Sequence, residues 1–316
     1  MPGLKQAARL ANERLLHHLA PYGNVPVQHT PSLWKHESNR IFFALVVDDF
    51  GIKSTLQAAT SHLLQALWDK YQITVDPSGT KLLGFVHDWD YPTRKVYLSM
   101  PNYVQHSLHQ LQHYLPTRLQ HSPHLHKKPS YGQKIQFADS QDDTKEFFFT
   151  ASAKTLIQRI IGIFLYYGIA LDLTMLVALG TIATHQSKPT ESLWNDITWF
   201  LNYAASHPDA KICFSARDMI LHIVRDGSYL SETKSRSRVG GILYLSSKLP
   251  KHNQAPDCNH PFNAPFHVVA KILNMITSSS METEVAATFY NAKEALPFRV
   301  TLYRNGPPTT TYSYGS

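Results

Sequence analysis

The chain has 316 residues, of which 43% are hydrophobic and 17% charged, with two cysteines and a formal net charge of +7. This length suggests roughly two domains, each able to bury a core of its own. Two cysteines form no disulfide framework, and the first twenty residues lack the continuous apolar segment of a signal peptide, so secretion is disfavoured. We therefore expect an intracellular protein, cytoplasmic or nuclear, whose basic charge suits phosphate-bearing partners.

The first part of the chain alternates predicted helices and strands. Apolar spacing predicts helices at 4–20 and 55–71, with a buried strand, IFFALVV, between them at 41–47. The Pro- and Gly-containing stretch 21–40 is predicted to be loop. Two further segments, LLGFVHDWDY and RKVYLSM, predict a hairpin, and a helix is expected at 101–114.

The second part is predicted to be helical first and then strand-rich. Helices are expected at 153–170, 172–187 and 190–206, followed by the strands MILHIVRD, GGILYLSS and FHVVAKI and a helix at 280–299. Glycines and Asp172 interrupt the apolar run 160–182, which favours a buried helix pair over a membrane span. The fold class is therefore α+β. The predicted organisation is a first domain at 1–115, an exposed linker at 116–150, a helical connection at 151–208 and a last domain at 209–316.

Two acidic groups are candidate metal sites. Asp48 and Asp49 lie side by side at the end of a predicted buried strand, and carboxylates in such a place can hold Mg²⁺ for phosphoryl transfer. Asp226 ends a later predicted strand, and Glu284 lies near the start of the last predicted helix. Each acidic group also has an interpretation without metal. Asp48 and Asp49 would lie in a turn, and Glu284 would belong to a serine-capped helix whose first-turn acids interact favourably with the helix dipole.

Several segments together resemble the reverse transcriptase of Ty1/copia-type retrotransposons. GLKQAAR at 3–9, VVDD at 46–49 and the predicted hairpin are similar to segments of that enzyme, in the same order. The resemblance implies that Asp48 and Asp49 are palm metal ligands. It also implies that Gly3, Lys5 and Gln6 line the nucleotide and template pocket.

The resemblance continues through the second half of the chain. The segment from Gln158 is similar to the family's connection between polymerase and ribonuclease H, and RDGSYLSETKSRSRVGGILYLSS and SSSMETEV resemble its ribonuclease H segments. It implies that Asp226 and Glu284 bind Mg²⁺ or Mn²⁺, with Glu282 as a neighbour. The implied architecture is a partial palm and thumb, a helical connector and an incomplete ribonuclease H-like mixed sheet with a helix.

The family's active sites each use a further carboxylate that we do not find in this sequence. In the family, one lies upstream of the GLKQ segment and the other on a fourth ribonuclease H strand. We therefore expect impaired or absent polymerase and nuclease activity, with binding of RNA–DNA hybrid or primer-template retained. Two alternatives remain: a non-catalytic module that binds nucleic acid or a partner chain supplying the missing elements, and the product of a decayed reading frame.

Overall fold

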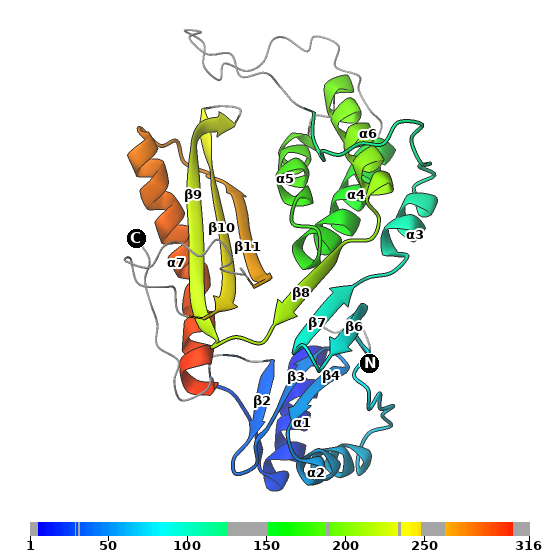
Figure 1. Ribbon diagram of the computed structural model, residues 1–316, viewed down its shortest axis with the longest axis vertical. Helices are drawn as coiled ribbons and strands as arrows, with labels where there is room; N and C mark the ends of the chain where they lie inside the picture. The colour runs from blue at the N-terminus through cyan, green and yellow to red at the C-terminus, as the bar shows by residue number, and fades with distance from the viewer. Residues whose placement is uncertain are drawn as a thin grey trace. The chain divides into compact units, whose positions relative to one another are not determined.

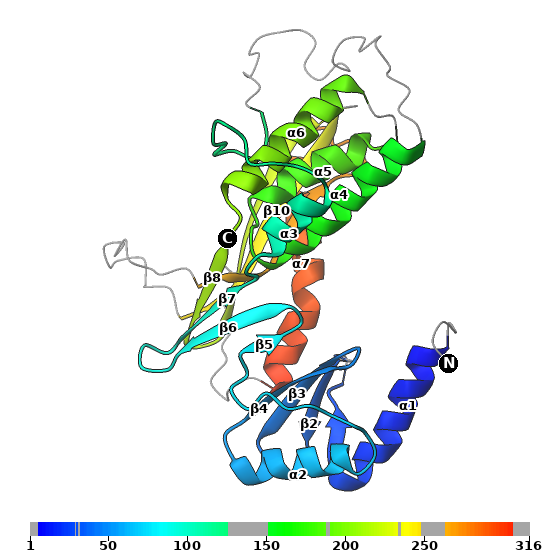
Figure 2. The same ribbon diagram turned by 90° about the vertical axis from the view of Figure 1, so that its right-hand side faces the viewer.

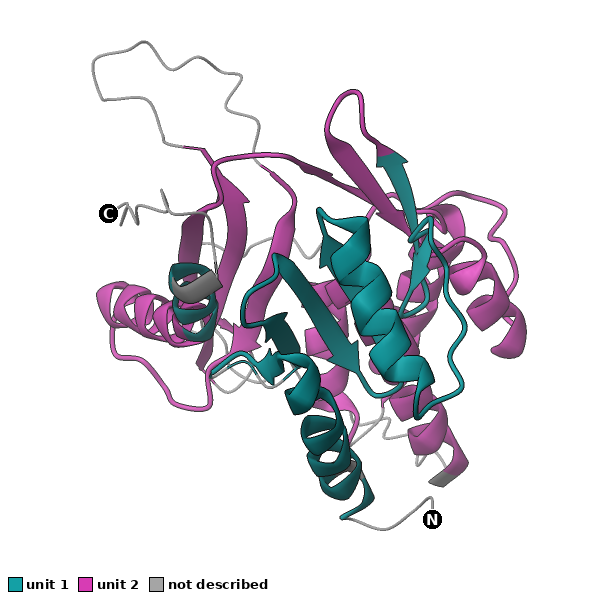
Figure 3. Cartoon of the chain, turned by 90° about the horizontal axis from the view of Figure 1, so that it is seen from below, with its two compact units in different colours: residues 1–89, 297–306 teal, residues 90–296, 307–316 magenta. Residues whose placement is uncertain are grey.

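The computed structural model describes residues 6–28, 30, 32–125, 151–187, 190–232, 235–247 and 263–305. The chain divides into two compact units: unit 1 contains residues 1–89 and 297–306, and unit 2 contains residues 90–296 and 307–316 (Figure 3). Helices and antiparallel strands occur in both, so the predicted α+β class is confirmed. The division between units falls at 89/90, and most of the predicted linker at 116–150 lies outside the described residues.

Unit 1 is built on an antiparallel sheet with strand order β1-β2-β3-β4. Its elements are α1 (Ala7–Leu19), the short helix η1 (Ala20–Tyr22), β1 (Asn24–Pro26), β2 (Leu33–His36), β3 (Ile41–Val46), β4 (Asp49–Ser54), α2 (Gln57–Trp68), β5 (Lys81–Leu82) and β6 (Phe85–Asp90). Both predicted helices and the predicted strand are confirmed. The loop predicted at 21–40 was wrong in part, because β1 and β2 lie within it and pair with each other from Asn24↔His36 to Pro26↔Trp34.

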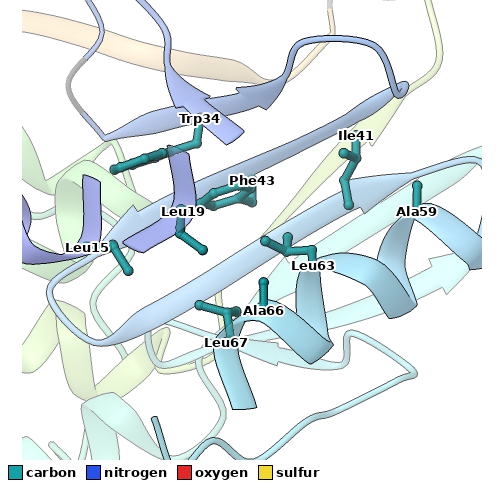
Figure 4. Close-up of a cluster of buried hydrophobic side chains, with 9 residues drawn as sticks. All are labelled: Leu15, Leu19, Trp34, Ile41, Phe43, Ala59, Leu63, Ala66 and Leu67. Carbon is teal, nitrogen blue, oxygen red and sulfur yellow. The ribbon is translucent and has the colours of Figure 1, made fainter. Parts of the chain in front are cut away.

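The core of unit 1 lies between its sheet and its two helices (Figure 4). Trp34 on β2 and Phe43 on β3 stack with ring centroids 5.6 Å apart, and both are buried. Helices α1 and α2 add the aliphatic side chains Leu15, Leu19, Leu63 and Leu67. On α2, Ala59, Leu63, Ala66 and Leu67 recur at spacings of three and four residues, so one stripe of the helix is buried. This core holds β3 and β4, and with them the Asp48–Asp49 turn.

A polar turn follows α2 and is centred on the carboxylate of Asp76. One oxygen accepts from the Ser78 amide at 3.0 Å and from the Ser78 hydroxyl, and the other accepts from the Thr80 amide at 2.8 Å and the Thr80 hydroxyl at 2.9 Å. The hydroxyls of Ser78 and then Thr80 are the largest causes that hold the pKa of Asp76 below its ordinary value.

This turn is expected to weaken when acid protonates Asp76. Because the folded pKa is lowered, its stabilising effect is present above the ordinary aspartate pKa of about 4 and is lost as the pH falls towards the folded value. The urea midpoint of the wild type should therefore fall between pH 5 and pH 2 by more than that of Asp76→Asn. A Ser78→Ala/Thr80→Val variant, which keeps the carboxylate and the two amide bonds, should lose the larger part of this pH dependence, because the two hydroxyls are the largest causes of the lowered pKa. Equal midpoint shifts in all three proteins would contradict this account.

Unit 2 contains a helical group and two separate sets of paired strands. Its elements are β7 (Lys95–Ser99), α3 (Tyr103–Gln110), α4 (Ala151–Ala170), α5 (Met175–His185), α6 (Glu191–Ser206), β8 (Lys211–Ser215), β9 (Ile220–Glu232), β10 (Arg236–Ser246), β11 (Pro265–Ile272) and α7 (Ser280–Asn305), of which residues 297–305 belong to unit 1. Strand β8 was not predicted, and it pairs antiparallel with β7 from Lys95↔Ser215 to Ser99↔Lys211.

Helices α4, α5 and α6 lie beside one another (Figure 2). The apolar run 160–182 forms the end of α4 and most of α5, so the predicted helix pair is confirmed. Phe164 and Tyr167 of α4 are fully buried, and the Tyr167 hydroxyl donates to Pro208 O at 3.0 Å and accepts from the Ala210 amide at 2.9 Å. Between the helices, Asp172 accepts hydrogen bonds from Thr174 and Tyr203. None of the helices in the described ranges has the length and apolar character that crossing a bilayer requires.

The last part of unit 2 is an antiparallel sheet with strand order β11-β10-β9, and α7 runs along it (Figure 1). All three predicted strands and the predicted helix are confirmed. A small apolar cluster joins them, formed by Val239, Val269, Leu273, Ala286 and Ala287. Alanines at the helix face and glycines on the strands allow the helix to approach closely, and this approach places Glu284 beside β9.

Candidate functional site

The Asp48–Asp49 pair lies at the tip of the β3–β4 hairpin. Val46 pairs with Asp49, so Val47 and Asp48 form the connection and Asp49 is the first residue of β4. Both carboxylates are exposed. The sequence left two explanations for these adjacent acids, a metal site and a turn, and the structure shows a turn.

Val47 adopts an unusual backbone conformation beside this pair. Its φ is 58°, in the left-handed region that β-branched residues rarely occupy, and its side chain is 92% exposed. Because the side chain of Val47 is exposed, core packing does not explain why a valine occupies this strained position. The conformation directs the chain from β3 into β4 in two residues and so keeps both acids at the outer end of the hairpin.

The resemblance also assigns three residues near the N-terminus to a nucleotide and template pocket, and the structure describes only one of them. Gly3 and Lys5 lie outside the described residues. Gln6 is exposed and precedes α1, where its carbonyl accepts from the Leu10 amide at 3.0 Å. Among the residues proposed for a nucleotide and template pocket, only Gln6 therefore has a described position, and that position is a helix start.

The second acidic pair lies where α7 meets the edge strand β9. Asp226 is in β9, exposed and paired in register with Gly240 of β10. Glu284 is in the first turns of α7. One of its oxygens accepts from the Gly227 amide at 3.2 Å, and the other accepts from the Arg225 guanidinium at 2.8 Å. Glu284 thus bonds to the two residues that flank Asp226 in β9.

Asp226 and its two neighbours in β9 point to opposite faces of the sheet. A Cβ built on Gly227 would lie 3.0 Å from atoms of Thr283, so residue 227 faces α7. Successive residues in a strand point to opposite faces, so Asp226 leaves the strand on the face away from α7. Arg225 lies on the α7 face with Gly227, and it was not singled out by the sequence reasoning. The only sequence signal was its place next to Asp226.

Two hydrogen-bonded groups fix the start and middle of α7. The hydroxyls of Ser237, Thr277 and Thr283 are buried and linked by contacts of 2.7 Å, from Ser237 to Thr277 and from Thr277 to Thr283. One turn after Ala287, Asn291 donates to Gly240 O at 3.0 Å. The positions of Glu284 and Arg225 therefore depend on residues that carry no metal chemistry themselves.

The predicted serine cap of α7 is confirmed. The Ser279 hydroxyl accepts from the Glu282 amide at 3.1 Å, and the Glu282 carboxylate accepts from the amide and the hydroxyl of Ser278, each at 2.6 Å. These bonds from Ser278, the side-chain one first, lower the pKa of Glu282. Glu282 therefore serves the helix start, as the ordinary reading of this segment proposed.

The described part of the predicted linker, residues 116–125, is exposed or half-buried at every position, and it forms hydrogen bonds with α6. The Gln120 amide donates to the Ser206 hydroxyl at 3.0 Å, and the Trp199 indole donates to Ser122 O at 3.0 Å. Between them, Nδ1 of His121 lies 3.1 Å from Nε2 of His207. Residues 126–150, including His126 and the lysines that follow it, lie outside the described residues.

The residues at Glu284 do not fit a resident divalent ion. Both of its oxygens accept hydrogen bonds from the protein, and one of the donors is a cation. In the part of the chain that the structure describes, no group of three or more His, Cys, Asp or Glu side chains is arranged to hold a metal ion. We therefore assign no catalytic step to a metal at this position.

No protein-family model matches the chain, and no curated protein matches it.

Proposed function

We propose that the chain is part of a copia-type reverse transcriptase and ribonuclease H polyprotein that acts inside the cell, in the cytoplasm or nucleus. We further propose that it binds RNA–DNA hybrid or primer-template with little or no catalysis. The resemblance of the sequence segments supports the family assignment. The proposed loss of catalysis rests on the ion pair between Arg225 and Glu284. This pair neutralises a carboxylate that metal-dependent cleavage would need.

The net charge of +7 supports nucleic acid as the partner. Lysines and arginines that neutralise phosphates release counterions, so such binding weakens as salt is added. A contact with about four phosphates would lower the binding constant about 10²-fold between about 50 and 200 mM salt.

The experiment that tests this proposal measures binding and cleavage of one labelled RNA–DNA hybrid by the full chain. We expect salt-dependent binding, with cleavage in Mg²⁺ or Mn²⁺ no greater than that of the Asp226→Asn variant. Cleavage that Asp226→Asn abolishes would show a working nuclease and overturn the proposed loss of catalysis. Absence of binding at low salt would overturn the proposal of a nucleic-acid partner.

The outer side of α7 favours a second candidate function, the binding of a partner chain. Met281, Val285 and Phe289 follow one another at intervals of four residues, and all three are exposed. Apolar side chains in such a stripe are typical of a helix that another chain covers. If a folded Phe289→Ser variant loses a partner chain in sedimentation, the result favours partner binding. If its sedimentation is unchanged and it still binds the hybrid, the result favours nucleic-acid binding.

A further inference from the structure

We propose that Arg225 takes the place of a divalent cation at Glu284 and keeps the site between β9 and α7 free of metal. Its guanidinium Nη1 lies 2.8 Å from Oε2 of Glu284, and the Gly227 amide lies 3.2 Å from Oε1. The carboxylate is thus bound at both oxygens by groups of β9. Arg225 is a specificity-determining residue in this role, because it decides which cation Glu284 binds.

The strand pairing explains why Arg225 can reach Glu284. Arg225 is opposite Gly241 of β10, which has no side chain, and the space over Gly241 is filled by Asn291 of α7. Residue 227, two positions along on the same face, is also a glycine, so β9 itself places no side chain between Arg225 and the start of α7. The guanidinium therefore extends along β9 to the first turns of the helix.

Charge makes this arrangement unfavourable for a metal ion. A divalent cation at Glu284 would stand close to the guanidinium, and repulsion between charges of +2 and +1 at roughly 5 Å in water corresponds to about a tenfold loss in binding constant. The pair itself is partly exposed, at 38% for the Arg225 side chain and 41% for Glu284, so its attraction alone contributes only a few-fold effect. The repulsion is therefore the larger of the two terms, and removal of the arginine charge should reveal metal binding.

The test measures binding of Mn²⁺ to the full chain by the loss of the free-ion signal in electron paramagnetic resonance. We expect Arg225→Gln to bind Mn²⁺ about tenfold more tightly than the wild type, and Arg225→Lys, which keeps the charge, to resemble the wild type. Arg225→Gln/Glu284→Gln should lose the gain, because the carboxylate is then absent. Arg159→Gln, on α4, changes the net charge equally and should show no gain.

Equal Mn²⁺ affinity in the wild type and in Arg225→Gln would overturn the proposal, as would an equal gain in Arg159→Gln. If the glutamine variant does not fold by circular dichroism, Arg225→Ser removes the same charge and is read in the same way. The proposed function supplies only the choice of a divalent ion as the probe. Since nucleic acid is absent from the measurement, failure of hybrid binding and failure of this proposal are separate results.

Discussion

Replacement of Gly241 by alanine is expected to lower the free energy of unfolding of unit 2 by about 3 kcal/mol. A Cβ built on Gly241 would lie 1.7 Å from Oδ1 of Asn291 and 2.4 Å from its Cγ. Asn291 is 1% exposed and donates to Gly240 O and to Ala287 O, so its side chain has no open space to enter. Overpacking typically costs about 1–3 kcal/mol, and loss of a buried hydrogen bond costs about 1–3 kcal/mol more. Urea unfolding followed by circular dichroism measures the change.

Gly240→Ala is the matched control, one residue away on the same strand. A Cβ there would have its nearest neighbour, Val269 O, at 3.9 Å, which is ordinary contact. We expect a change within about 1 kcal/mol, because alanine also lowers the entropy of the unfolded chain. Asn291→Ala in the Gly241→Ala background should recover part of the loss, since it removes the colliding atoms. Equal destabilisation by both glycine variants would contradict the close approach of α7 to β10.

The fold could be predicted from the sequence where a segment was long enough to show a period. Helices α2, α4 and α6 each repeat their apolar positions over about three turns or more. The three segments predicted as strands of the last sheet fall within strands of 13, 11 and 8 residues. Strands β1, β2 and β8 span three to five residues, so alternation has too few positions to be recognised. Strand β8 is also defined by pairing with β7, more than a hundred residues earlier, and local pattern carries no trace of such a partner.

At the candidate site, the sequence drew attention to Asp226 and Glu284 and gave no sign that Arg225 pairs with Glu284. Asp226 and Glu284 drew attention because acidic residues at a predicted strand end and at a predicted helix start are visible one at a time. The predicted strand end was wrong, because β9 continues past Asp226 to Glu232. The Arg225–Glu284 pair joins residues 59 positions apart, and it depends on the register of β9 and the approach of α7. In the same way, the contact of Asn291 with Gly241 depends on the packing of a helix on a strand. Both contacts form only when α7 packs on the strands, and no single residue or short segment reveals that packing.

Replacement of Phe43 by alanine is expected to lower the free energy of unfolding of unit 1 by about 3–5 kcal/mol. Phe43 is 1% exposed, stacks on Trp34 of β2 and contacts Phe50 of β4 with ring centroids 5.9 Å apart. Truncation of a buried aromatic ring removes its transfer free energy and leaves a cavity that the neighbours fill only in part. Because β3 pairs with both β2 and β4, this loss should loosen the hairpin that carries Asp48 and Asp49. Amide hydrogen exchange of β4 measures it directly.

Val47→Ala is the control for this hairpin, because it removes apolar atoms from the exposed tip and leaves the core intact. Alanine keeps a side chain at the same left-handed φ of 58° and loses only atoms that are exposed, so we expect a stability change of about 0.5 kcal/mol or less. Exchange in β4 should therefore stay slow in Val47→Ala and become fast in Phe43→Ala. If both variants exchanged alike, the hairpin would be held by its turn and not by the Trp34–Phe43 stack. The Asp48–Asp49 pair would then owe its position to local backbone geometry, and changes in the core would leave it in place.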